Sequence, residues 1–234
     1  HTTDKGEKME SVVVNPRKFT HEEVWQQENV KRTRRFAEIK EAVCDCSKQE
    51  GMQKLGFTDK TYYQQFKAAF YLAQLAHKNQ IDKAGMDYIC HPATVALHVR
   101  DTYPASKKRD RAMIVALLHD VLEDTSVTTD ALKSFGFDEK IIHTVELLSR
   151  EPGESYDVYL EKLQVSKAAI RVKCADMTDN ENLNRMKAPA AKDMRRSAFY
   201  RSRRLVLESR LREKKRHKEK KTVETAVQQN MPTV

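Results

Sequence analysis

The sequence predicts an all-α protein. Its 234 residues include only six Gly and six Pro, whereas 33% are charged and 39% are hydrophobic. So few turn-forming residues favour helices over a turn-rich β architecture. No run of alternating polar and apolar residues is long enough to predict a sheet. The hydrophobic fraction is sufficient for a genuine core, so we expect a folded helical protein.

The first 55 residues are expected to form an extension to the main domain. Residues 1–19 begin with His rather than Met, and we expect this segment to be disordered or derived from an expression vector. Residues 20–55 have a charged and weakly helical pattern, which predicts an N-terminal helical extension. The residues expected to face inward are Val24, Trp25, Phe36, Ile39 and Val43.

The main domain is expected over residues 56–190. Between residues 62 and 76, apolar side chains recur every three or four positions, which is the spacing of an amphipathic helix, and a loop follows. Proline fits best in the first turn of a helix, so Pro92 marks the start of the next one. Thr128 and Asp138 are predicted N-caps of two later helices. Further helices are predicted at residues 111–121, 156–163 and 166–184.

The positive charge of the protein is confined to one segment near the C-terminus. The net charge is +9, but residues 195–221 alone hold 13 Lys and Arg against three Glu, so the rest of the chain is close to neutral. We expect a basic C-terminal helix over residues 191–221 and a flexible tail over residues 222–234. The basic helix either binds an anionic partner such as RNA or is a solvated charged helix end.

The cysteines and the absence of targeting signals predict a cytoplasmic protein. Cys44, Cys46, Cys90 and Cys174 show no spacing typical of a disulfide framework. The sequence contains no secretory signal and no apolar stretch long enough to span a bilayer, so we expect no membrane association. Cys44 and Cys46 could begin a metal site, but no second Cys/His pair of matching spacing exists.

The segment "ALLHDVLEDT" at residues 116–125 places His119 and Asp120 directly after an apolar helical run. Such groups rarely enter a core unpaired. His91, which precedes Pro92, and Asp176, which follows the apolar lead "IRVKCAD", are in similar surroundings. If the four side chains converge, they make a mixed nitrogen and oxygen site with open positions, suited to Mn²⁺ or another divalent metal rather than to structural zinc.

Two further acids, Glu123 and Asp124, lie one helical turn beyond His119 and Asp120. Acids near a metal that are not ligands can position or deprotonate a water and protonate a leaving group. Helix capping or surface charge is the alternative interpretation. We favour the catalytic one because two acids so close together repel each other, and a nearby cation would remove that cost.

These motifs resemble a known family. The strings "AHKNQIDKAGMDYICHPATVA", "VALLHDVLEDTSVT", "FGF" and "RVKCADMTDN" are similar in order and spacing to the HD-type hydrolase domain of the RelA/SpoT alarmone enzymes and their small stand-alone relatives. The resemblance covers residues 62 to about 185. It implies an HD-domain helical bundle that binds Mn²⁺ and removes the 3′-diphosphate of guanosine tetra- and pentaphosphate (ppGpp and pppGpp), giving GDP or GTP and pyrophosphate.

The resemblance also implies roles for individual residues. Glu123 and Asp124 would be the catalytic acids. Asn180 would contact the ribose, Lys83 and Lys173 would offset phosphate charge, and Tyr88 would also contact the substrate. The implied metal ligands are His91, His119, Asp120 and Asp176.

The sequence departs from the family at the loop that helps to hold the base. Where many members have an Arg-Lys pair, this chain has Asp82 and Lys83, and Asp87 replaces a proline. Asp82 is expected either to face the base or to turn toward solvent or Lys83. This departure keeps open a second function, hydrolysis of a different nucleotide by the same site. A third is an inactive regulatory module that binds RNA or an acidic partner through the basic tail.

Overall fold

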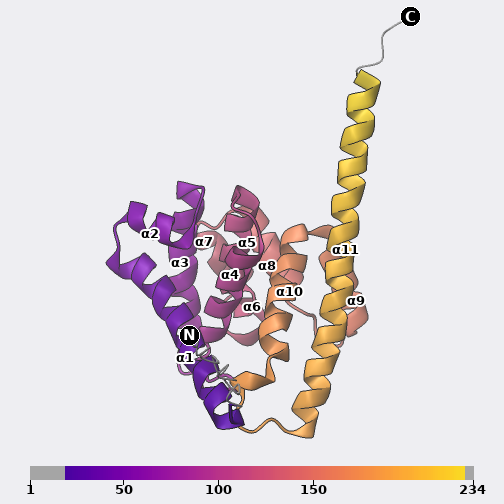
Figure 1. Ribbon diagram of the computed structural model, residues 1–234. Helices are drawn as coiled ribbons and strands as arrows, with labels where there is room; N and C mark the ends of the chain where they lie inside the picture. The colour runs from indigo at the N-terminus through magenta and orange to yellow at the C-terminus, as the bar shows by residue number, and fades with distance from the viewer. Residues whose placement is uncertain (1–18, 230–234) are drawn as a thin grey trace, which may run out of the picture.

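The computed structural model describes residues 19–229, with side chains given up to residue 217 and at residue 220. It confirms the predicted all-α class: apart from one isolated bridge between Ile81 and Asp87, the described residues form helices and connecting loops (Figure 1). The α-helices are α1 His21–Lys40, α2 Lys48–Leu55, α3 Lys60–Ala76, α4 Cys90–Thr102, α5 Lys107–Leu118, α6 Val121–Asp124, α7 Thr129–Ser134, α8 Glu139–Leu148, α9 Tyr156–Lys162, α10 Lys167–Glu181 and α11 Ala191–Gln229. The shorter elements are a π-helical turn, η1 Glu41–Asp45, and two 3₁₀ turns, η2 Leu163–Val165 and η3 Leu183–Arg185.

Helix α5 is the centre of the bundle. Every side chain from Ala112 to Leu118 is fully buried. Helices α3, α4, α8 and α10 pack around it. A helix that is apolar on all sides must be enclosed on all sides. The candidate site therefore begins at the end of an enclosed apolar segment.

The N-terminal helices pack onto this bundle. Thr20 and Glu23 form a capping box that starts α1, and α1 contacts α4 and η3. Ile39 from α1 and Val43 from η1 join the hydrophobic core. Arg32, in the middle of α1, is fully buried as well. The segment predicted as an extension therefore shares the core of the main domain.

Helix α11 runs beside α10 and then continues beyond the rest of the bundle (Figure 1). Arg204 fixes it to α10 with two hydrogen bonds to the Glu181 carboxylate, the shorter one 2.7 Å long, and Leu207 is fully buried. The helix extends to Gln229, so residues 222–229 of the predicted flexible tail are helical, and residues 230–234 lie outside the described residues. Within the described residues, no helix is both long and apolar enough to cross a membrane.

Candidate functional site

The site begins at a break between α5 and α6. Helix α5 ends at Leu118, and α6 begins at Val121. Asp120, between them, has φ −103° and ψ −5°, outside ideal helical geometry. On a continuous helix, adjacent side chains point about 100° apart. The break lets His119 and Asp120 approach each other, with Nε2 and Oδ2 3.0 Å apart.

Four side chains from three segments converge at this break. His91, in the first turn of α4, places its Nε2 3.1 Å from Asp176 Oδ1 and 3.7 Å from Asp120 Oδ2. His119 Nε2 is 3.7 Å from Asp176 Oδ1. The ligand atoms of His91, His119 and Asp176 all lie within 4.8 Å of one another, and all three residues are buried. The structure thus brings together the four residues predicted as metal ligands.

Hydrogen bonds at Nδ1 set the orientation of both imidazoles. The Nδ1 atom of His91 is 2.7 Å from Asp179 Oδ2, and that of His119 is 2.8 Å from the carbonyl oxygen of Ala116. Because both neighbours are acceptors, each ring donates through Nδ1 and keeps Nε2 for the centre of the cluster. This arrangement of an outer acceptor behind a ligating imidazole is typical of metal sites.

The cluster fits a divalent metal ion. His119 Nε2 is buried and faces the Asp120 and Asp176 carboxylates at 3.0 and 3.7 Å, but it forms no well-aligned hydrogen bond with either, so its ring nitrogen can serve as a ligand. Two imidazole nitrogens and two carboxylates form a mixed donor set that leaves positions open. Burial alone would lower the pKa of His119, but the Asp120 and Asp176 carboxylates outweigh it and raise the pKa to about 10. The centre of the cluster therefore attracts positive charge.

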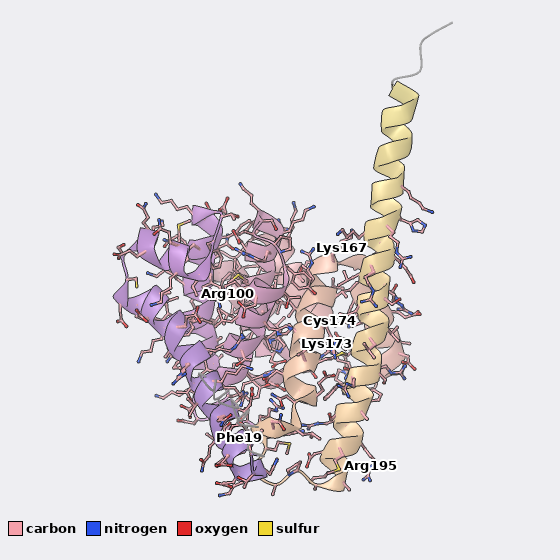
Figure 2. All side chains as sticks on the ribbon, viewed as in Figure 1. Phe19, Arg100, Lys167, Lys173, Cys174 and Arg195 are labelled. Carbon is pink, nitrogen blue, oxygen red and sulfur yellow. The ribbon has the colours of Figure 1, made fainter. Side chains whose placement is uncertain are left out.

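Lys173 forms an ion pair with the Asp176 carboxylate of the cluster. It lies on α10 next to Cys174 (Figure 2), and its Nζ is 2.8 Å from Asp176 Oδ2 and 5.3 Å from the centre of the Tyr159 ring. Burial opposes the charged form of Asp176, but Lys173 and the two histidines hold the pKa of Asp176 well below its usual range. The charge of Lys173 thus acts on Asp176, and its side chain does not line the neighbouring cavity.

A cavity of about 340 Å³ adjoins the cluster, which is within the range of about 300–1,000 Å³ typical of small-molecule sites. Eight of the residues that line it were predicted as site residues: Asp82, Lys83, Tyr88, His91, Asp120, Asp124, Asp176 and Asn180. Ile81, Arg185, Arg196 and Tyr200 line it as well and were not predicted. Arg196 and Tyr200 come from α11, so the basic helix forms one wall of the cavity.

The two predicted acids occupy different places. Asp124 lines the cavity, and its Oδ2 is 3.2 Å from the Tyr88 hydroxyl, which is also 2.7 Å from Asp120 Oδ2. Glu123 is exposed and does not line the cavity; its Oε2 accepts a hydrogen bond of 3.1 Å from the backbone amide of Arg150. In this arrangement Asp124 is the acid next to the cluster.

Asp82 takes neither of the two orientations expected from the sequence. Its Oδ2 lies 2.7 Å from Arg32 Nη1, and its Oδ1 accepts hydrogen bonds from the backbone amides of Ala84 and Met86. The side chain is only 4% exposed. Both oxygens are therefore held by the protein, which leaves Asp82 little capacity to bind a base.

The structure also reveals a supporting residue that sequence reasoning missed. Asp179 Oδ2 accepts from His91 Nδ1 and, at 2.8 Å, from Arg185 Nη1. A signal was available, since Asp179 follows Asp176 by three positions and therefore lies on the same face of a helix. Asn180, the predicted ribose contact, donates to Asp176 Oδ1 and accepts a hydrogen bond of 2.8 Å from Arg185 Nη2.

The comparisons with known proteins agree with this geometry. No family model matches the chain. The chain is 28% identical over 144 residues to a guanosine-3′,5′-bis(diphosphate) 3′-pyrophosphohydrolase of Aquifex aeolicus, which is 58% of this chain but only 20% of that relative. A solved structure of a metazoan ortholog of SpoT that hydrolyses ppGpp superposes with a TM-score of 0.51 at 22% identity, over 63% of this chain and 85% of the other. The chain is therefore like the RelA/SpoT hydrolase domain in sequence and in fold.

Proposed function

We propose that the protein is a metal-dependent phosphohydrolase that removes the 3′-diphosphate of guanosine tetra- or pentaphosphate and yields GDP or GTP and pyrophosphate. The observation that carries the proposal is the convergence of His91, His119, Asp120 and Asp176 beside a cavity of about 340 Å³. The similarity to a bis(diphosphate) 3′-pyrophosphohydrolase supports the substrate class.

His91, His119, Asp120 and Asp176 would hold the metal, and we propose Mn²⁺ because the donor set combines imidazole with carboxylate. When bound, such a metal lowers the pKa of a coordinated water and polarises a phosphoryl oxygen. The chain's own groups position the reactants. The two Nδ1 hydrogen bonds fix the imidazoles, and Lys173 keeps Asp176 ionised.

Proton transfer is assigned to Asp124. It is the predicted acid that lines the cavity, and the Tyr88 hydroxyl is within hydrogen-bond distance of both Asp124 and Asp120. Burial and the nearby carboxylates raise the pKa of Tyr88 far above its usual range, so its hydroxyl stays protonated and can donate to either acid. Glu123 would act in this step only after leaving the backbone amide of Arg150.

Two cations are available for the phosphate groups of the substrate. Lys83 and Arg196 line the cavity and form no ion pair with any described residue. Arg185 also lines the cavity, but it already donates hydrogen bonds to Asp179 and Asn180. Arg196 also has a buried Nε without a hydrogen-bond partner. A nucleotide with two diphosphates carries several negative charges, and unpaired cations in a concave site offset such charge.

The proposal is tested with a panel of nucleotides, incubated with and without Mn²⁺ and analysed by product identification. Guanosine bis(diphosphate) should give GDP and pyrophosphate only with metal. His119→Ala should lose both metal retention and turnover, because it removes the imidazole whose Nε2 faces the cluster. His143→Ala is the matched control, since His143 is an exposed residue of α8. Full metal occupancy in His119→Ala would contradict the ligand assignment.

The basic end of α11 remains a candidate for binding an anionic partner such as RNA. The lining of the cavity ends at Tyr200, so deletion of residues 210–234 should leave turnover of a free nucleotide nearly unchanged. RNA binding by this segment would appear as a salt-sensitive affinity that is lost in the same deletion. A large fall in activity of the folded deletion variant would instead assign the segment to the nucleotide site.

A further inference from the structure

Arg32 is a buried charge that the proposed chemistry does not use. It lies on α1, and its side chain is 0% exposed. A guanidinium is costly to bury unless it is paired. Its Nη1 lies 2.7 Å from Asp82 Oδ2, and its Nη2 lies 3.4 Å from Asp179 Oδ2. Arg32 therefore bridges two carboxylates that belong to different parts of the site.

The first of these carboxylates, Asp82, stabilises the turn that contains Lys83. Asp82 Oδ1 accepts from the amides of Ala84 at 2.8 Å and Met86 at 3.0 Å, and the Asp82 amide donates to the Met86 carbonyl at 2.8 Å. Gly85 supplies the positive φ of 80° that the turn requires. The position of Lys83 in the cavity depends on this turn, and Arg32 stabilises the turn through its ion pair with Asp82.

The second carboxylate orients a metal ligand. Asp179 Oδ2 lies 2.7 Å from His91 Nδ1, and the same oxygen faces Arg32 Nη2. One guanidinium thus reaches both the turn and the support of His91. A lysine ammonium could not do this equally well, because its donors diverge from a single nitrogen whereas the two nitrogens of Arg form a rigid fork.

We propose that Arg32 is a positioning residue that fixes the turn of residues 82–86 and the imidazole of His91 relative to each other. Helix α1 is then a part of the nucleotide site. The identity of the bound nucleotide rests on the proposed function, but the positioning itself does not. The arginine that pairs with Asp82 comes from α1, far from residue 82 in the sequence.

Arg32→Met is the direct test, because Met keeps the apolar stem and removes the charge. The variant should fold, since Asp82 keeps two backbone donors and Asp179 keeps His91 and Arg185. Without nucleotide or metal, amide hydrogen exchange at Ala84 and Met86 should accelerate at least about tenfold, as expected when a local structure loses a supporting contact. The affinity for Mn²⁺ should fall by less than about tenfold, because Asp179, which orients His91, loses one of its two guanidinium partners but keeps Arg185.

Kinetics separate positioning from a general loss of stability. With guanosine bis(diphosphate), Arg32→Met should raise KM about 10-fold to 100-fold with a smaller change in kcat, because Lys83 binds the substrate. Arg32→Lys should restore part of the loss. The matched control is Arg35→Met, on the same helix, whose Nη2 is 3.0 Å from Asp101 Oδ2 and which does not line the cavity. It should leave all three measurements unchanged.

Unchanged exchange at Ala84 and Met86 together with native Mn²⁺ affinity in folded Arg32→Met would overturn the proposal. If Arg32→Met does not fold, Asp82→Asn takes its place: Asn keeps an oxygen for the two amides but turns a donor toward Arg32, and it should give the same faster exchange. If the native protein does not hydrolyse guanosine bis(diphosphate), the proposed function fails, and exchange and Mn²⁺ affinity still decide the role of Arg32.

Discussion

Replacement of Asp179 should weaken metal binding although Asp179 is not a ligand. Its Oδ2 accepts from His91 Nδ1 at 2.7 Å, and His91 offers Nε2 to the cluster. Loss of such an outer partner typically costs 10- to 100-fold in metal affinity, or about 1.4–2.7 kcal/mol. Asp179→Asn keeps an oxygen that can accept from Nδ1, so we expect a loss near tenfold. Asp179→Ala removes the acceptor, so we expect a loss near 100-fold.

The assay is a titration of the metal-free protein with Mn²⁺, monitored by the electron paramagnetic resonance signal of the free ion. Burial opposes ionisation of Asp179, but His91, Arg32 and Arg185 hold its pKa well below the usual range, so its charge is constant above about pH 5. Asp101→Asn, on the exposed surface of α4, is the matched control and should bind as the native protein does. Native affinity in a folded Asp179→Ala variant would refute the reasoning.

Three further predictions concern pH, packing and base selectivity. In the metal-free protein the pKa of His119 is raised from 6.5 to about 10, so the stability that His119 contributes is complete below pH 6.5 and is lost as the pH rises toward 10. Because a ligating imidazole must lose this proton, Mn²⁺ uptake near pH 8 should release one proton, measurable in weakly buffered solution. Gly51→Ala should destabilise the fold by about 2–4 kcal/mol in urea unfolding, because the added Cβ would lie 2.0 Å from Tyr63 Oη and 2.2 Å from the Ala42 carbonyl oxygen; an unchanged midpoint would contradict this. Since Asp82 is held by Arg32 and two amides, kcat/KM for guanosine and adenosine 3′-diphosphate nucleotides should differ by less than about tenfold, and a preference above about 100-fold would point to a bidentate base contact.

The sequence predicted the helices and the individual residues of the cluster, because both leave local patterns. The convergence of these residues from distant segments depends on the fold. The N-caps Thr128 and Asp138 were identified correctly, since capping is decided within four residues. His119 and Asp176 were identified because each follows an apolar run. The run predicts that a polar side chain is buried, which is costly unless the side chain has a partner. Such local signals do not depend on knowing which segments meet in the folded chain.

The rest depends on contacts between distant segments. Arg32 is 147 positions from Asp179, and in the sequence it is one of four cations in "KRTRR", which is typical of a solvated helix face. Arg196 and Tyr200 belong to a segment whose charge suggested a role outside the site. The orientation of Glu123 toward the Arg150 amide depends on where the end of α8 lies, which no local pattern of "LEDT" indicates.

The Asp179 carboxylate influences how the chain folds. Its Oδ2 atom accepts hydrogen bonds from Arg32 on α1, His91 on α4 and Arg185 on η3, so a single atom connects segments that lie between residues 32 and 185 of the chain. Contacts of such long sequence separation form late, because the loop entropy must be lost before they stabilise anything. We therefore expect the proposed metal site to form among the last steps of folding. A ligand present at 100 times its Kd adds about 2.7 kcal/mol to the native state, so chelation should lower the Tm of the whole bundle, and metal supply should influence how long the protein persists.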